Sequence, residues 1–328
     1  MSKRIVWIAL ATVLVGGFSS ESDAAEIYPS RPITLVMPYA AGGSADTLLR
    51  IIAERMKVSL GGQVIIENVT GAAGSIGTGR VARAAPDGYT AGLGTWSTHV
   101  ANGAVYALPY DLLGDFQPIA LIASSPILIA ARNAMPARDL KELVAWLKAN
   151  PDKATQGTNG SGSVMHLAGV LLQRETGTRY DFVPYRGAGS AMQDLLAGRI
   201  DLYLGLPADI LPHARSGRVT VYAVAAKQRL AAAPGVPTVD EAGVPGLHVS
   251  AWFGLWAPKG TPRDVIGKLN AAAAEALADP SISQRLKDDL NLEVPPPEQR
   301  TPEYLGAYQK AEIEKWWPII RGTNIKAE

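Results

Sequence analysis

The chain has 328 residues, of which 47% are hydrophobic and 19% are charged, and its formal net charge is +1. This composition suits a globular chain with a large core and excludes a disordered one, and the absence of a basic block argues against nucleic acid or an anionic membrane surface as a partner. The chain contains no cysteine, which excludes disulfides, thiol catalysis, cysteine-ligated zinc and iron–sulfur clusters.

The N-terminal segment has the layout of a secretory signal peptide. Lys3 and Arg4 precede an apolar stretch from Ile5 to about Phe18, and a polar segment with small residues follows. The alternative is a membrane anchor, but the apolar stretch is shorter than the ~20 residues that a spanning helix needs. We therefore predict export to the periplasm with cleavage near Ala24. Because no cysteine follows the apolar stretch, the mature protein should carry no lipid anchor.

Short apolar runs then alternate with helical patterns. The runs "ITLVM" (33–37), "QVIIENV" (63–69) and "YTAGLGT" (89–95) read as strands, each followed by a glycine-rich turn, a helical pattern or a loop. Pro126 interrupts the long run 116–132, and proline cannot occupy the middle of a central strand, so we expect two strands in two different sheets. Alternation of this kind predicts an α/β fold with mostly parallel sheets.

A second α/β series follows, beginning with the amphipathic helical pattern at 137–150. After a Pro/Gly-rich connection the strand-like segment "HVSAWFGLWAPKG" (248–260) leads into a helical tail. A helical tail cannot form a sheet by itself, so we expect it to cover the first sheet. The predicted organisation is a signal peptide (1–24), a first lobe (25–125 plus 249–328) and a second lobe (126–248). The two chain crossings between the lobes would form a hinge.

Two turns place glycines and hydroxyl residues at the start of a helix. They are "YAAGGSAD" (39–46) and "GTNGSGSVMHL" (157–167). The first N–H groups of a helix lack partners and the helix dipole favours an anion, so a carboxylate can bind there without a lysine. Asp46 either takes part or only complements the dipole. Four hydroxyl residues either donate to a ligand or only cap the helices: Ser44, Thr158, Ser161 and Ser163.

Motifs for catalysis or cofactors are weak. "GTGRVA" (77–82) fits a dinucleotide pattern, but it lies far from the preceding strand, and no acid follows at the expected distance. There is no G-x-S-x-G nucleophile motif, so we predict no enzymatic activity and no cofactor. The histidines show no metal-ligand spacing, so we predict no metal; they are His99, His166, His213 and His248.

Two further sets of residues have open interpretations. Asp201 and Asp209 flank "LYLGLP", and either one faces the cleft or both cap neighbouring elements. Aromatic residues recur near turns, where they either wall a pocket or pack in the core; they are Tyr39, Trp96, Tyr185, Trp252 and Phe253.

Six segments together resemble the Bug receptors, the extracytoplasmic solute-binding components of tripartite tricarboxylate transporters. They are "YPSRPITLVMPYAAGGSADTLLR", "VIIENVTGAAGSIGTGRVARAAPDGYT", "GTNGSGSVMHLAGVLL", "VPYRGAGSAMQDLLAGRIDLYL", "PGVPTVDEAGVPG" and "WFGLWAPKGTP". The resemblance spans essentially the whole mature chain, and several of these motifs are long.

This resemblance implies a type II periplasmic-binding-protein fold, with two α/β lobes that close by a hinge over an interlobe cleft. It also implies small organic acids as ligands, among them dicarboxylates, amino acids and aromatic acids. One ligand carboxylate would lie between a turn of the first lobe and a turn of the second, held largely by backbone amides and waters.

Carried over by motif, the ligand-binding residues fall into four groups. Family members often have an Asn-Pro pair just after the last group, whereas this chain has Asn102 followed by Gly103. The groups are Tyr39, Ala40, Ala41, Gly42, Gly43, Ser44 and Asp46; Thr158, Asn159, Ser161, Gly162 and Ser163; Arg186, Gly187 and Ala188; and Ser97 and Thr98.

We therefore expect a monomeric periplasmic receptor that captures a small organic carboxylate and delivers it to the membrane subunits of a tripartite tricarboxylate-type transporter. The alternative from another class is a sensor that passes the ligand signal to a signalling system without transport. A periplasmic enzyme comes third, because it would require a paired nucleophile and base in the cleft.

Overall fold

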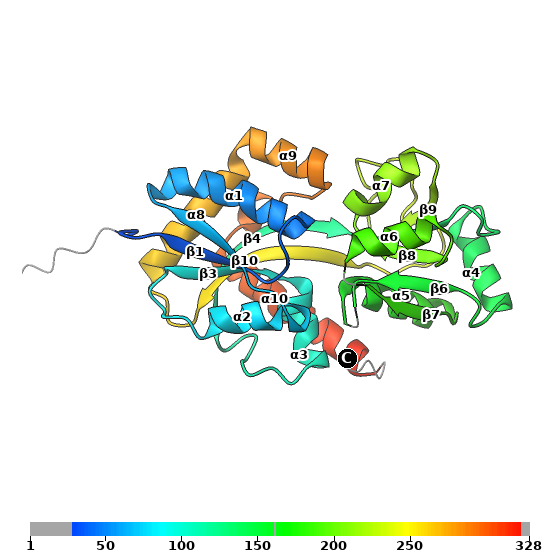
Figure 1. The fold of residues 1–328 in the computed structure, drawn as a ribbon, viewed down its shortest axis with the longest axis horizontal. Helices are drawn as coiled ribbons and strands as arrows, with labels where there is room; N and C mark the ends of the chain where they lie inside the picture. The colour runs from blue at the N-terminus through cyan, green and yellow to red at the C-terminus, as the bar shows by residue number, and fades with distance from the viewer. Residues whose placement is uncertain (1–27, 161, 186, 323–328) are drawn as a thin grey trace, which may run out of the picture.

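The structure is a computed structural model that describes residues 28–160, 162–185 and 187–322. It consists of two α/β lobes side by side, each built on one five-stranded sheet (Figure 1). The expected signal peptide lies outside the described residues. In the described part of the chain, no helix combines the length and the apolar character that crossing a membrane requires.

The first sheet has the strand order β2–β1–β3–β10–β4. β1 runs parallel to both of its neighbours, whereas β10 runs antiparallel to both β3 and β4. Four of the five residues of β1 are buried, as expected of a central strand covered on both faces. The strands are β1 (Ile33–Met37), β2 (Val64–Asn68), β3 (Thr90–Thr95), β4 (Phe116–Pro126) and β10 (Ser250–Pro258).

The second sheet repeats this plan with the order β7–β6–β8–β5–β9. β6 runs parallel to β7 and β8, and β5 runs antiparallel to β8 and β9. Both sheets are therefore mixed rather than mostly parallel as expected, because β10 in the first sheet and β5 in the second run against the other strands. The strands are β5 (Leu128–Arg132), β6 (Thr155–Thr158), β7 (Asp181–Pro184), β8 (Leu202–Gly205) and β9 (Val219–Val224).

Helices cover both faces of each sheet (Figure 1). On one face of the first sheet lie α1 (Ser44–Leu60), α8 (Arg263–Ala278) and α9 (Pro280–Leu290), and on the other lie α2 (Ser75–Ala82), α3 (Asn102–Val105) and α10 (Pro302–Arg321). The second sheet carries α6 (Ala188–Leu196) and α7 (Pro207–Arg215) on one face, and α4 (Leu140–Ala149) and α5 (Val164–Thr176) on the other. The C-terminal helices thus return to the first sheet.

Backbone hydrogen bonds join the segments that connect the lobes. β4 ends at Pro126 and β5 begins at Leu128 in the other sheet, so the expected division of this long apolar run into two strands is confirmed. Ile127 N–H donates to the Val249 carbonyl at 3.0 Å, and Val249 N–H donates to the Ala225 carbonyl at 3.0 Å. Ala225 N–H in turn donates to the Ile127 carbonyl at 2.8 Å. The crossing is a narrow strip of main chain, which is the kind of element that bends in hinge closure.

Candidate functional site

A cleft of about 980 Å³ lies between the lobes, at the carboxyl ends of β1 and β6. In each sheet, the next two strands of the chain lie on opposite sides of one strand. β2 and β3 flank β1 in the first sheet, and β7 and β8 flank β6 in the second. The chain therefore leaves these strands in one direction and returns in the other. Open α/β sheets bind ligands at such a switch of direction.

Most of the residues expected from sequence line this cleft. Thirteen of them do: Tyr39, Ala40, Ala41, Gly42, Gly43, Ser44, Asp46, Ser97, Asn159, Gly162, Ser163, Gly187 and Ala188. Thr98 and Thr158 do not line it and are buried. Ser161 and Arg186 lie outside the described residues.

The two buried threonines have structural partners instead. Ser97–Ala101 forms a π-helical turn rather than an open loop, which directs Thr98 inward. Its hydroxyl accepts from Thr95 N–H at 2.9 Å and contacts His99 Nδ1 at 3.0 Å. Thr158 is the last residue of β6, and its carbonyl accepts from Tyr185 N–H at 2.8 Å.

The first glycine turn is held in shape by Asp46. Gly42 has a φ of +88°, a left-handed conformation that favours glycine, and its N–H donates to Asp46 Oδ2 at 2.9 Å. Arg50 binds the same carboxylate with two nitrogens, at 2.9 and 3.0 Å. Asn68 donates to Asp46 Oδ1 and to the Tyr39 carbonyl, both at 2.9 Å. Asp46 therefore positions the turn, and its hydrogen-bonding capacity is used within the protein.

These contacts keep the Asp46 carboxyl ionised. Burial by itself would raise its pKa, but the hydrogen bonds from Arg50, Gly42 and Asn68 outweigh burial and lower the pKa. The side chain is only 3% exposed, and its charge is balanced by Arg50. The carboxylate therefore does not oppose an anion that binds beside it.

Backbone donors remain open at the start of α1. Gly43, the residue before the helix, has no side-chain cap, and the Ser44 hydroxyl makes no hydrogen bond with the described residues. The N–H groups of Gly43, Ser44, Ala45 and Asp46 likewise have no acceptor in the described part of the protein. Ser44 is thus not a cap, and the helix presents several donors and the positive end of its dipole to the cleft.

The second glycine turn repeats the geometry of the first with different residues. Gly162 has a φ of +77°, and its N–H donates to His166 Nδ1 at 3.1 Å, four residues ahead, just as Gly42 donates to Asp46. Ser163 caps α5 by accepting from His166 N–H at 3.3 Å, so the capping interpretation holds for this serine. The N–H groups of Val164 and Met165, which line the cleft, have no acceptor among the described residues.

Two more helices begin at the cleft. Gly187 precedes α6 without a side-chain cap, and Gly187, Ala188 and Gly189 line the wall. Leu206 and Asp209 bring the start of α7 to the same space. Four helix N-termini therefore converge here, whereas no lysine, arginine or histidine is among the described lining residues. The positive potential comes from main-chain dipoles rather than from side chains.

The "GTGRVA" segment has a packing role. Its residues form the body of α2 rather than a turn before a helix. A Cβ on Gly77 would lie 2.6 Å from the Val69 carbonyl oxygen and 3.0 Å from Pro38 Cα. The glycine permits close packing of the helix against the strand end, so the dinucleotide interpretation has no structural basis.

Several lining residues escaped the sequence analysis. Ala72 and Ala73 follow β2 with φ values of +45° and +50°, which non-glycine residues rarely adopt, and Asn102 donates to the Ala73 carbonyl at 3.1 Å. Nothing in the sequence reveals a left-handed alanine. The other residues missed are Met37, Ala45, Thr95, Tyr106, Gly160, Val164, Met165, Gly189, Leu206 and Ala251.

The aromatic residues divide between wall and core. Tyr39, Trp96 and Phe253 line the cleft, whereas Trp252 is fully buried and Tyr185 lies off the wall. Tyr39 OH contacts Thr95 Oγ1 at 3.0 Å, and Trp96 donates to Glu312 Oε2 at 2.9 Å. These rings are fixed by partners, and they give the cleft apolar surface beside its polar donors.

Asp209 is the acidic residue of the described wall whose carboxylate has no partner among the described residues. It lies in the first turn of α7 and lines the cleft, whereas Asp201 is paired with Arg132 at 2.7 Å. The Asp209 carboxylate makes no hydrogen bond and no ion pair with the described residues. Burial raises the pKa of its carboxyl to about 6.

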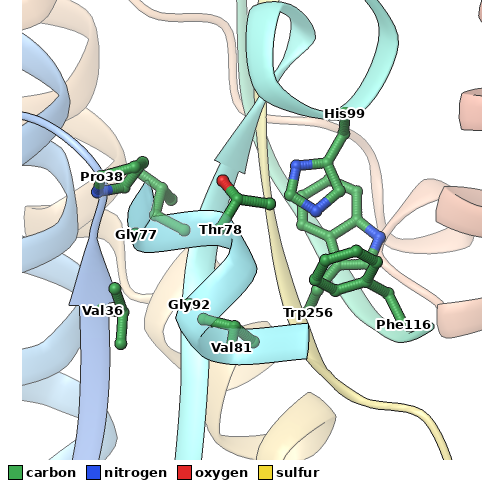
Figure 2. Close-up of a pocket in the computed structure, with 10 residues that line it drawn as sticks. Val36, Pro38, Gly77, Thr78, Val81, Gly92, His99, Phe116 and Trp256 are labelled. Carbon is green, nitrogen blue, oxygen red and sulfur yellow. The ribbon is translucent and has the colours of Figure 1, made fainter. Parts of the chain in front are cut away.

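A second cavity, inside the first lobe, is too small for an organic ligand (Figure 2). Its volume is about 10 Å³, which is the space of a single water molecule. His99 stacks on Trp256 with ring centroids 3.9 Å apart, and burial lowers the pKa of His99 to about 3. Its Nε2 has no hydrogen-bond partner among the described residues. The histidine is a neutral core residue.

Two similar lobes, a main-chain hinge and a cleft walled by helix N-termini define a class of protein. They are the features of two-lobed solute-binding proteins, in which ligand sits between the lobes.

Comparisons with known proteins agree with this class. The family model described as the tripartite tricarboxylate transporter family receptor, TctC, matches residues 48–325. A UPF0065 protein of Agrobacterium vitis is 38% identical over 98% of this chain and 91% of its own length. MatC from Rhodopseudomonas palustris, solved with bound malate, is 39% identical with a TM-score of 0.82, covering 89% of this chain and all of its own. The periplasmic binding protein BugD is 37% identical with a TM-score of 0.82, covering 92% of this chain and all of its own.

The chain belongs to the TctC family of tripartite tricarboxylate transporter receptors, to which the Bug proteins are homologous. The resemblance seen in the sequence is thereby confirmed, and so is the type II periplasmic-binding-protein fold. Family membership places the chain among binding receptors and not among enzymes.

Proposed function

We propose that this protein captures a small organic carboxylate in the interlobe cleft and delivers it to the membrane subunits of a tripartite tricarboxylate-type transporter. The observation that carries the proposal is the convergence of four helix N-termini on a cleft whose described wall holds no basic side chain. A carboxylate carries one charge that a few aligned N–H groups can satisfy, whereas a polyphosphate recruits Lys and Mg²⁺. The malate bound to MatC supports the same ligand chemistry.

The ligand carboxylate binds between the two glycine turns. Gly43, Ser44 and Ala45 donate from the first lobe, and Val164 and Met165 donate from the second. A ligand that contacts both turns binds the closed form more tightly than the open one, and only this difference in affinity drives closure. We assign residues 25–125 plus 249–328 to one lobe and 126–248 to the other.

The remaining assignments concern the cell. We propose that residues 1–24 direct export to the periplasm, where the monomeric protein presents its closed, loaded form to the transporter. Membership in a family of transporter receptors supports this assignment.

The test is a calorimetric and thermal-shift screen of the purified protein against succinate, malate and benzoate, with sucrose and choline as uncharged and cationic controls. A true ligand present at 100 times its Kd stabilises the folded state by about 2.7 kcal/mol, which is a clear rise in Tm. Stabilisation by sucrose or choline with none by the acids would refute the carboxylate assignment.

A further inference from the structure

One carboxylate of the cleft wall has no partner among the described residues. Two of the described lining residues are acidic, Asp46 and Asp209. Asp46 is occupied by Gly42, Asn68 and Arg50. The Asp209 carboxylate makes no hydrogen bond and no ion pair with the described residues, although it borders the cleft.

The described surroundings of Asp209 give its carboxylate no hydrogen-bond donor. Its own N–H donates to the Leu206 carbonyl at 3.1 Å, and Pro207 at the start of α7 has no N–H. Tyr203 is close enough that the charge of Asp209 adds to burial in raising the pKa of the phenol. The Tyr203 hydroxyl, however, donates to Asn159 Oδ1 at 3.4 Å. Asn159 belongs to the second glycine turn, and both Asn159 and Asp209 line the cleft.

A charged group left without a partner at a ligand surface is balanced when the ligand brings that partner. We propose that Asp209 accepts a hydrogen bond from a protonated amine of the ligand, so that the ligand is an amino-carboxylate. The inference rests on the proposed function: the carboxylate of the ligand binds at the glycine turns and its ammonium group binds at Asp209. A dicarboxylate would bring a second negative charge against the same side chain, and this repulsion selects against it.

The test compares amino ligands with dicarboxylates of similar length by isothermal titration calorimetry at pH 7.5. 4-Aminobutyrate and β-alanine replace one carboxylate of glutarate and of succinate by an ammonium group. L-Glutamate and L-aspartate keep both carboxylates and add an ammonium group to the same two acids. We expect at least one amino ligand to bind wild-type protein about ten-fold or more tightly than its dicarboxylate. Asp209→Asn should weaken binding of that ligand about ten-fold or more, and it should leave unchanged or strengthen the binding of the dicarboxylate.

Asp181→Asn is the matched control. It removes the same charge from the same lobe, at an exposed position of β7 away from the cleft wall, and it should not alter the preference. Equal or tighter binding of the dicarboxylates, or an unchanged preference in Asp209→Asn, would overturn the inference while leaving carboxylate binding intact. Failure of every carboxylate to bind would remove the proposed function as well.

Discussion

Replacing Asp209 with asparagine should stabilise the ligand-free protein at neutral pH. Burial raises the pKa of this carboxyl from 3.8 to about 6, and each tenfold change in a protonation equilibrium corresponds to about 1.4 kcal/mol. The ionised side chain therefore costs the folded state about 3 kcal/mol. In a protein of this size, relief of that cost raises Tm by roughly 6 °C. Ligand sites are where proteins retain such unfavourable groups.

The pH dependence gives this prediction its sign. The folded-state pKa lies above the unfolded value, so the folded state holds the proton more tightly, and stability falls as pH rises from 3.8 to about 6. Above pH 6 the full cost is present in wild-type protein and absent from Asp209→Asn; near pH 3.8 most of the difference disappears. Urea unfolding at pH 4 and pH 7.5 measures the difference in unfolding free energy between wild-type protein and Asp209→Asn, with Asp181→Asn as control. A difference that is no larger at pH 7.5 than at pH 4 would refute the reasoning.

Four further substitutions test the turns and the packing around the cleft. Gly43→Val should abolish carboxylate binding. It should change the unfolding free energy by less than about 0.5 kcal/mol, because Gly43 is extended and a Cβ there meets no atom within 4 Å. Intact affinity in calorimetry would contradict the proposed site. Gly42→Val should in addition lose about 1–2 kcal/mol in urea unfolding, because its φ is +88°. Asp46→Ala should lower the unfolding free energy by about 3 kcal/mol and weaken ligand binding, since a buried ionised hydrogen-bond network is lost; wild-type stability would show that Asp46 does not hold the turn. Gly77→Ala should destabilise by about 1–3 kcal/mol through its clash with the Val69 carbonyl, and no nucleotide should shift its Tm.

The local features of this protein could be predicted from the sequence because they depend on local chemistry. Strands such as 33–37 are continuous apolar runs, and glycine with a helical pattern behind it marks the start of α1 and of α5. The break at Pro126 predicted the passage from one sheet to the other. The motifs of the Bug receptors extended these predictions to the fold and to most of the residues that line the cleft.

Strand direction and the details of the wall could not be predicted in this way. Apolar periodicity is the same for parallel and antiparallel strands, so the mixed character of the sheets was not visible. Thr98 and Ser97 are adjacent hydroxyl residues, and only the π-helical turn decides that one is buried and the other faces the cleft.

The sequence by itself determined where the chain forms strands, turns and helix starts, because those preferences arise within a few residues. Only the tertiary structure decided which donors and charges reach the cleft, because that depends on contacts between distant segments. Asn68, 22 positions away in the sequence, donates one of the hydrogen bonds that keep the Asp46 carboxyl ionised. Asp209, in the first turn of α7, lines the cleft with a carboxylate that has no partner among the described residues, whereas Asp201, just before β8, is paired with Arg132.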